Sequence, residues 1–136
     1  MTSTVLHVVV GVLTDAGGRV LIQRRAVKAH QGGLWEFPGG KRELDETVLD
    51  ALQRELQEEL AITIDTNTAQ PLIQIEHDYG DRQVLLDTWR VASWTGEPFG
   101  LEGQPIAWVS PCGLNQFSFP EANRSIVAAL QNSAQV

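Results

Sequence analysis

The chain has 136 residues, 43% of them hydrophobic and 20% charged, which is typical of a globular domain with one core. The net charge of -7 at pH 7 would repel the phosphates of DNA or RNA, so binding to a nucleic-acid polymer is disfavoured. The single cysteine, Cys112, excludes an intrachain disulfide, and we expect it to be a buried apolar residue.

The apolar run near the N-terminus has no basic residues before it and is too short to span a membrane. A reducing, cytoplasmic setting without membrane attachment is therefore the expectation.

Strand and helix patterns follow one another along the chain. Residues 5–15 are rich in β-branched residues and predict a buried strand. Glycine and proline punctuate residues 26–40, which predicts a structured loop. The other predicted elements are a turn at 15–18, a strand ending at Arg24 and Arg25, a helix over 47–60, two strands within 71–94 joined near Gly80 and Asp81, a loop over 95–105, a strand over 106–110 and a helix over 119–131 with Pro120 in its first turn.

No repeat or linker interrupts this series, so we expect one domain over residues 1–136. Strands and helices intermixed around one sheet predict a layered α/β (α+β) fold.

The predicted helix over 47–60 has three distinct faces when each residue advances by about 100°. An apolar stripe should face the sheet, and it consists of Leu49, Leu52, Leu56 and Leu60. The opposite, solvated side carries Asp50, Gln53 and Gln57. Three carboxylates fall together at the edge of the apolar stripe: Glu55, Glu58 and Glu59.

Three carboxylates in one place repel each other unless a cation neutralises them. Hard divalent ions such as Mg²⁺ bind carboxylate oxygens and keep waters for substrate phosphates. The alternative is an ordinary solvated charged face. The position beside the apolar stripe, after a Gly-Gly loop, favours the metal.

The spacing of this region resembles a known signature. Gly40 is followed after five residues by Glu46, then after seven residues by Arg54-Glu55-Leu56, and after single residues by Glu58-Glu59 and Ala61-Ile62. This resembles the box of the Nudix hydrolases, which cleave nucleoside diphosphates linked to another moiety. The resemblance implies the Nudix fold, a mixed β-sheet sandwiched between α-helices. Ala61 stands where the family has glycine, so the turn after the helix either costs stability or is formed differently.

Segments outside the box are similar to the MutT-type branch of the family. They are "RRAVKAH", "EFPGGK", "GEPFGLEGQP" and "FPEAN", in this order. The resemblance implies a hydrolase that converts 8-oxo-dGTP to its monophosphate and pyrophosphate, with water attacking the β-phosphorus. The implied partner is a small nucleoside triphosphate, and we expect a monomer.

The resemblance also implies a role for each matching position. Mg²⁺ or Mn²⁺ would be held by the carbonyl of Gly39 and by Glu55, Glu58, Glu59 and Glu102. Arg54 and Glu46 would pair and orient the metal-binding glutamates. Because phosphoryl hydrolysis needs a proton acceptor near the attacking water, Glu55 is also our choice of general base.

Base recognition should lie outside the box. The amide of Asn123 can bond to a purine edge, although helix capping is an alternative role for it. The other implied nucleotide-binding positions are Arg25, Phe37, Lys41, Asp81 and Arg82, of which Phe37, Asp81 and Arg82 could act through backbone groups. Solvated surface residues are the alternative for Arg25 and Lys41.

Two competing functions stay open on the sequence. One is a Nudix enzyme for another nucleotide, such as a pyrimidine triphosphate, because "QGGLWEFPGGK" (residues 31–41) also fits that group. The other is a domain that binds nucleotide without turnover. Such domains usually lose box glutamates, and this chain keeps all three.

Overall fold

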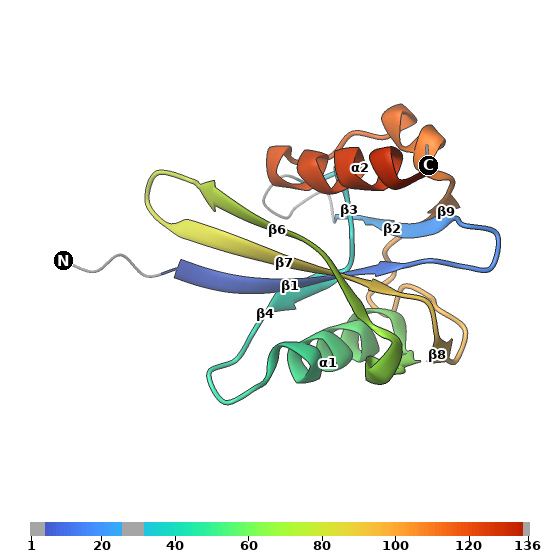
Figure 1. Ribbon diagram of the computed structural model, residues 1–136, viewed down its shortest axis with the longest axis horizontal. Coiled ribbons are helices and arrows are strands. Elements are labelled where there is room, and N and C mark those ends of the chain that lie inside the picture. The colour runs from blue at the N-terminus through green and yellow to red at the C-terminus, as the bar shows by residue number, and fades with distance from the viewer. Residues whose placement is uncertain (1–4, 26–31, 135–136) are drawn as a thin grey trace.

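The computed structural model describes residues 5–25 and 32–134, in which two long helices lie on opposite sides of a core of strands (Figure 1). The helices are α1 (Val48–Leu60) and α2 (Glu121–Ala134). The strands are β1 (Val5–Leu13), β2 (Val20–Arg24), β3 (Trp35–Glu36), β4 (Gly39–Lys41), β5 (Thr63–Ile64), β6 (Gln70–Asp78), β7 (Gln83–Val91), β8 (Trp94–Thr95) and β9 (Ile106–Val109), and two 3-10 turns are η1 (Thr66–Thr68) and η2 (Pro111–Gln116).

The central sheet of the described residues has the strand order β4-β1-β7-β6. β1 runs parallel to β7, from Val5 beside Gln83 to Leu13 beside Val91. β4 and β6 are antiparallel to their neighbours, so the sheet is mixed. A smaller antiparallel sheet has the order β3-β2-β9, and β5 pairs with β8.

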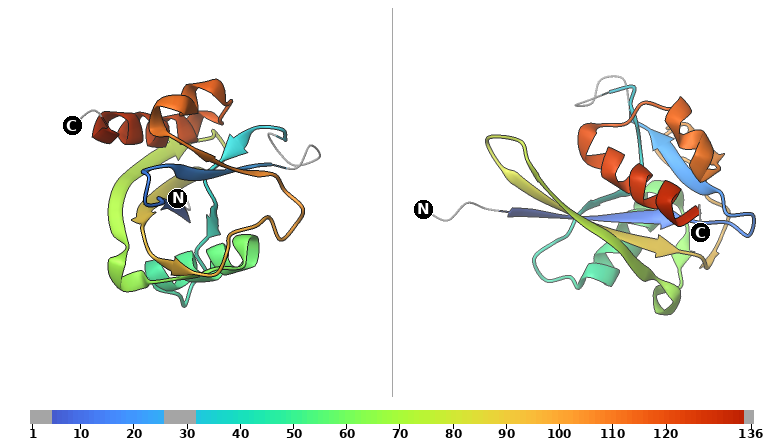
Figure 2. Two further views of the ribbon diagram at one scale, coloured as in Figure 1. Left: turned by 90° about the vertical axis from the view of Figure 1, so that its right-hand side faces the viewer. Right: turned by 45° about the horizontal axis from the view of Figure 1, so that its top comes forward.

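The two faces of β1 belong to two different apolar clusters, because successive side chains of a strand point to opposite sides. Val10 and Val12 pack in the cluster that includes Ile126 of α2. Val9 and Leu13 pack in the cluster that includes the buried leucines of α1. The left view of Figure 2 shows the two helices on opposite sides of these strands. The predicted fold, a mixed sheet between helices, is confirmed.

Helix α1 begins one residue after its cap, where the Thr47 hydroxyl accepts a hydrogen bond of 3.1 Å from the Asp50 amide. Ala51, Leu52, Leu56 and Leu60 are its buried residues, whereas Leu49 is only half-buried. The prediction that Gln53 is solvated was wrong. Its side-chain amide donates to the Ile62 carbonyl (3.4 Å) and accepts from the Ile64 amide (2.6 Å), because the chain folds back beside it.

The end of α1 shows how the chain turns with Ala61 in place of glycine. Ala61 adopts the left-handed conformation, with φ 62° and ψ 33°, and its amide donates to the Gln57 carbonyl. Alanine therefore forms the turn that glycine usually forms, at the steric cost that a Cβ atom brings to this conformation.

Three local expectations need correction. The predicted loop over 26–40 contains the short strand β3 and the first two residues of β4, and its residues 26–31 lie outside the described part. Cys112 is exposed rather than buried, because it lies in the surface turn η2. Pro120 directly precedes α2 instead of lying in its first turn. No helix in the described ranges is long and apolar enough to cross a membrane.

Candidate active site

Two glycines let β4 approach both β1 and α1 closely. A Cβ atom on Gly39 would overlap the Val9 carbonyl oxygen, and one on Gly40 would overlap the Glu55 carboxylate. Only glycine fits at these two positions without displacing backbone or the glutamate. The Gly-Gly pair therefore brings a backbone segment against the glutamates of α1.

Glu59 and Glu55 occupy the buried side of this contact. Glu59 Oε2 accepts a hydrogen bond of 2.9 Å from the Gly39 amide. Burial raises the pKa of Glu59 to about 8, and the negative charges of Glu36 and Glu55 add to the rise, while the Gly39 amide and the Gln23 side chain partly offset it. Burial also raises the pKa of Glu55, against the opposing effect of Arg54.

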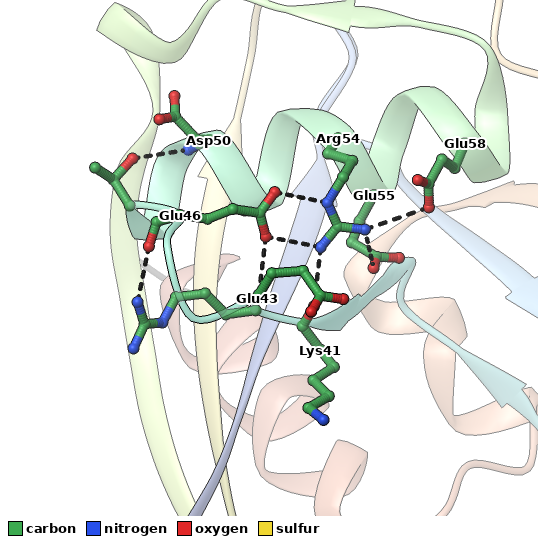
Figure 3. A network of polar contacts seen from close by, with 9 residues as sticks. Lys41, Glu43, Glu46, Asp50, Arg54, Glu55 and Glu58 are labelled. Carbon is green, nitrogen blue, oxygen red and sulfur yellow. Dashed lines mark hydrogen bonds and ion pairs between the residues drawn. The ribbon is translucent and has the colours of Figure 1, made fainter.

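Arg54 is the centre of a charged network at the other end of the site (Figure 3). Its guanidinium contacts both carboxylate oxygens of Glu46, at 2.6 and 2.8 Å, and Glu55 at 2.9 Å. It also contacts Glu58 at 3.4 Å and the Lys41 carbonyl at 3.0 Å. The hydrogen bonds from Arg54, followed by one from the Glu43 amide, lower the pKa of Glu46 to about 2. The predicted pairing of Arg54 with Glu46 is confirmed.

The carboxylates of the expected metal ligands do not converge on one point in this structure. No three acidic, histidine or cysteine side chains within the described ranges lie close enough together to hold an ion. Glu58 is exposed and turned toward Arg54, and Glu102 is exposed in the loop after β8. The donor set nevertheless fits a hard divalent ion, since it consists of oxygen atoms and includes two carboxylates whose pKa is raised by burial.

A cleft of about 390 Å³ gathers three of the predicted nucleotide-binding residues: Arg25, Asp81 and Arg82. Leu6, Val8, Val84 and Tyr79 complete its lining. Lys41 is directly opposite Val8 in the antiparallel pair of β4 and β1, so its side chain leaves the sheet on the same face. Sequence reasoning missed the apolar lining, because strand residues of a cleft look like core residues.

Phe37 and Asn123 meet on the side of the central sheet that α2 covers. Phe37 is 3% exposed, and its ring stacks on Phe119 with ring centres 5.6 Å apart, so the ring belongs to the core. Asn123 is the third residue of α2, and its Oδ1 accepts from the Phe37 amide at 3.4 Å. Its side chain therefore faces the segment that leads into β4, a position unlike that of a helix cap.

Sequence reasoning also missed a line of polar side chains between the cleft and α1. Glu36 binds Arg25 at 2.6 Å with one carboxylate oxygen and accepts from Gln23 at 3.1 Å with the other. Gln23 in turn accepts from Gln104 at 3.1 Å. The only signal in the sequence was a glutamine within the apolar run "VLIQ" (residues 20–23).

The cleft and the glutamates lie on opposite faces of the central sheet. Leu6, Val8 and Val84 belong to the cluster on the α2 side, whereas the apolar face of α1 covers the other side. The segment from β3 to β4 passes from one side to the other, and its residues Glu36 to Lys41 touch both groups (Figure 1).

The chain belongs to the Nudix domain family, because the model of the NUDIX domain matches residues 9–129. It is 42% identical over 126 residues to an 8-oxo-dGTP diphosphatase of Escherichia coli K12, covering 93% of this chain and 96% of that protein. It is 32% identical to a CTP pyrophosphohydrolase of the same organism, covering 89% and 88%. A solved structure described as MutT from Aliivibrio salmonicida and Vibrio cholerae superposes with a TM-score of 0.84, at 34% identity over 96% of this chain and 99% of that one.

Proposed function

We propose that the protein is a divalent-metal-dependent pyrophosphohydrolase that converts 8-oxo-dGTP to 8-oxo-dGMP and pyrophosphate. The similarity to the E. coli 8-oxo-dGTP diphosphatase over nearly the whole chain supports this substrate. The observation that carries the assignment is the contact of the Asn123 side chain with the Phe37 amide. The contact is 3.4 Å long, so a purine edge could replace it with shorter hydrogen bonds.

In this proposal Glu55, Glu58, Glu59, Glu102 and the Gly39 carbonyl would hold Mg²⁺ or Mn²⁺. A divalent ion held there would supply positive charge for the phosphate oxygens and make the attacking water more acidic. Glu55 accepts the proton of the attacking water, and burial favours this role by raising the pKa of its carboxylate. Arg54 holds one oxygen of Glu55, and Glu46 holds Arg54, so both act by positioning.

The nucleotide side of the site follows from the cleft. Arg25 and Arg82 provide positive charge in a protein of net charge -7, and Lys41 adds another cation on the same face. The backbone groups of Phe37 and the side chain of Asn123 offer donors and acceptors to the base. We further propose that the enzyme acts as a cytoplasmic monomer on free nucleotides.

A pyrimidine triphosphate is the second candidate substrate, because the CTP pyrophosphohydrolase relative is also similar over most of both chains. The Asn123 contact favours the oxidised purine, since a pyrimidine presents no fused-ring edge to it.

Steady-state hydrolysis of 8-oxo-dGTP, dGTP, CTP and ADP-ribose in Mg²⁺ tests the assignment. We expect 8-oxo-dGTP to have the largest kcat/KM and to lose its lead in Asn123→Ala. Asn132→Ala is the matched control, because Asn132 is an exposed asparagine of the same helix. Hydrolysis in ¹⁸O-water should place the label in pyrophosphate if the β-phosphorus is attacked. A lead for CTP, or an unchanged ranking in Asn123→Ala, would overturn the 8-oxo-dGTP assignment.

A further inference from the structure

The side chain of Gln104 uses both ends of its amide to hold the loop that carries Glu102. Its Oε1 accepts from the Glu102 amide at 2.9 Å. Its Nε2 donates to the Glu59 carbonyl at 3.0 Å and to Gln23 Oε1 at 3.1 Å. One half-buried glutamine therefore connects the backbone of two expected metal-binding residues, Glu59 and Glu102, which lie on different elements.

The same loop also donates hydrogen bonds to the last carbonyl groups of helix α1. The last carbonyls of a helix have no partner within the helix. The Leu60 carbonyl accepts from the Phe99 amide at 3.2 Å, and the Glu59 carbonyl accepts from the Leu101 amide at 3.0 Å in addition to Gln104. The loop that carries Glu102 is thus fastened to the last turn of the helix that carries Glu59.

Gln23 continues this connection to the cleft. Its side chain is buried in β2, with the residue 4% exposed, and both ends of its amide are bonded. Its Nε2 donates to Glu36, whose other oxygen binds Arg25 in the wall of the cleft. Burying an amide is unfavourable unless its groups are paired, so this arrangement fixes the orientation of Gln23.

We propose that Gln104 and Gln23 are positioning residues: their paired amides set the Glu102 loop against the end of α1 and align it with the Arg25–Glu36 pair. The inference rests on the proposed function, because it treats Glu59 and Glu102 as metal-binding residues. Gln104 bonds directly to the backbone of Glu59 and Glu102 and reaches the cleft only through Gln23, whereas Gln23 bonds directly to Glu36. Neither side chain takes part in the reaction itself.

Gln104→Met and Gln23→Met test this directly, because methionine keeps the length of the side chain and removes its hydrogen bonds. Gln57→Met is the matched control, since Gln57 is exposed on α1. In metal-free protein, amide hydrogen exchange at Glu102 should be at least about tenfold faster in Gln104→Met than in the parent and unchanged in Gln57→Met. Equal exchange in all three proteins would overturn the role of Gln104 in holding the loop.

Metal and nucleotide binding then separate positioning from a loss of stability. Residues that orient metal ligands typically contribute about 10–100-fold to metal affinity or activity. In Gln104→Met we expect Mn²⁺ affinity, measured by calorimetry, and kcat to fall about tenfold or more. KM and the affinity for 8-oxo-dGMP in EDTA should stay within about twofold. Gln23→Met should weaken Mn²⁺ binding and metal-free 8-oxo-dGMP binding together.

The double variant provides a further criterion. Because both residues act through one connection, Gln23→Met with Gln104→Met should lose no more Mn²⁺ affinity than the worse single variant. Lower melting temperatures with unchanged Mn²⁺ affinity and kcat would mean a purely structural role and would overturn the inference. If the parent fails to hydrolyse 8-oxo-dGTP, the proposed substrate is wrong, while exchange and Mn²⁺ binding still decide the role of the glutamines.

Discussion

Two carboxylates of this site, near opposite ends of α1, have opposite environments. Glu46 precedes the helix, and its two carboxylate oxygens accept from Nε and Nη2 of Arg54; these bonds and one from the Glu43 amide lower its pKa to about 2. Glu59 is the last residue but one of the helix, and burial raises its pKa to about 8, although hydrogen bonds from the Gly39 amide and the Gln23 side chain oppose the rise. The Glu46 end is a completed ion pair, whereas Glu59 forms no ion pair within the described residues 5–25 and 32–134.

The difference indicates that the carboxylates at the two ends of α1 have different roles. A carboxylate already paired with arginine gains little from a metal ion and serves best to hold Arg54 in place. A carboxylate that is costly to ionise in the protein gains most from a divalent ion. Arg54 links the two ends, because it also contacts Glu55.

The largest expected effect follows from changing the Glu59 end. Glu59→Gln keeps the shape of the side chain and removes its charge. If Glu59 binds the metal, kcat/KM should fall roughly 10³-fold, the equivalent of about 4 kcal/mol of transition-state stabilisation. Steady-state kinetics in saturating Mg²⁺ checks this. Glu97→Gln, in an exposed position of the loop after β8, is the control.

A smaller loss of activity is expected at the Glu46 end. Glu46→Gln breaks the two-oxygen contact with Arg54 and frees the arginine that orients Glu55. We expect kcat to fall about 10–100-fold, as for other groups that orient metal ligands. Steady-state kinetics of Glu46→Gln and Glu59→Gln under the same conditions compares the two losses. Equal losses in the two variants would contradict the division between positioning and metal binding.

Stability should respond to pH with opposite signs at the two ends. The folded pKa of Glu59 is raised from 4.5 to about 8. Its contribution to the free energy of unfolding is therefore complete below pH 4.5 and is lost as pH rises toward 8. The folded pKa of Glu46 is lowered from 4.5 to about 2, so its contribution is present above pH 4.5 and is lost as pH falls toward 2.

Thermal unfolding in EDTA measures this contrast. At pH 8 we expect Glu59→Gln to be more stable than the parent by on the order of 2 kcal/mol, because a buried charge is removed. Glu46→Gln should be less stable than the parent at pH 7, and the gap should close near pH 2. Millimolar Mg²⁺ should raise the melting temperature of the parent at pH 8 more than that of Glu59→Gln. Parallel pH profiles for all three proteins would refute the contrast.

The sequence predicted α1 and its charged pairs well because their determinants are local. The leucine spacing and the cap at Thr47 define the helix within fourteen residues, 47–60, and Glu46 lies eight positions before Arg54. The two- and three-residue strands β3 and β4 were missed because such short strands show no periodicity. Their partners are distant segments, as in the register of Gly39 beside Val10.

Long-range contacts explain the other omissions in the site. Gln23 and Gln104 are 81 positions apart, so only the fold shows that they meet. Gln53 was placed on the solvated side because helix geometry alone does not show that residues 62–64 return beside it. The cleft likewise combines residues from β1, β7 and the turn after β6.

The smallest expected effect is that of Ala61→Gly, which tests backbone strain at the Glu59 end of α1 separately from charge. Ala61 holds a left-handed conformation with φ 62°, and Ala61→Gly would relieve the contact of its Cβ atom with the backbone. Glycine also increases the entropy of the unfolded chain, which offsets part of this gain. We expect a net stabilisation of about 0.5–1 kcal/mol, or roughly 3 °C in melting temperature.

The control for this change is Ala69→Gly, because Ala69 has φ -70° and should lose stability by about 0.5–1 kcal/mol. If backbone strain and charge act separately, the stability gained in Ala61→Gly should not depend on pH. It should also add to the stability gained in Glu59→Gln. A gain that disappears in the Glu59→Gln background would show that the turn at Ala61 sets the burial of Glu59. The high pKa of Glu59 would then originate in the backbone conformation at the end of α1.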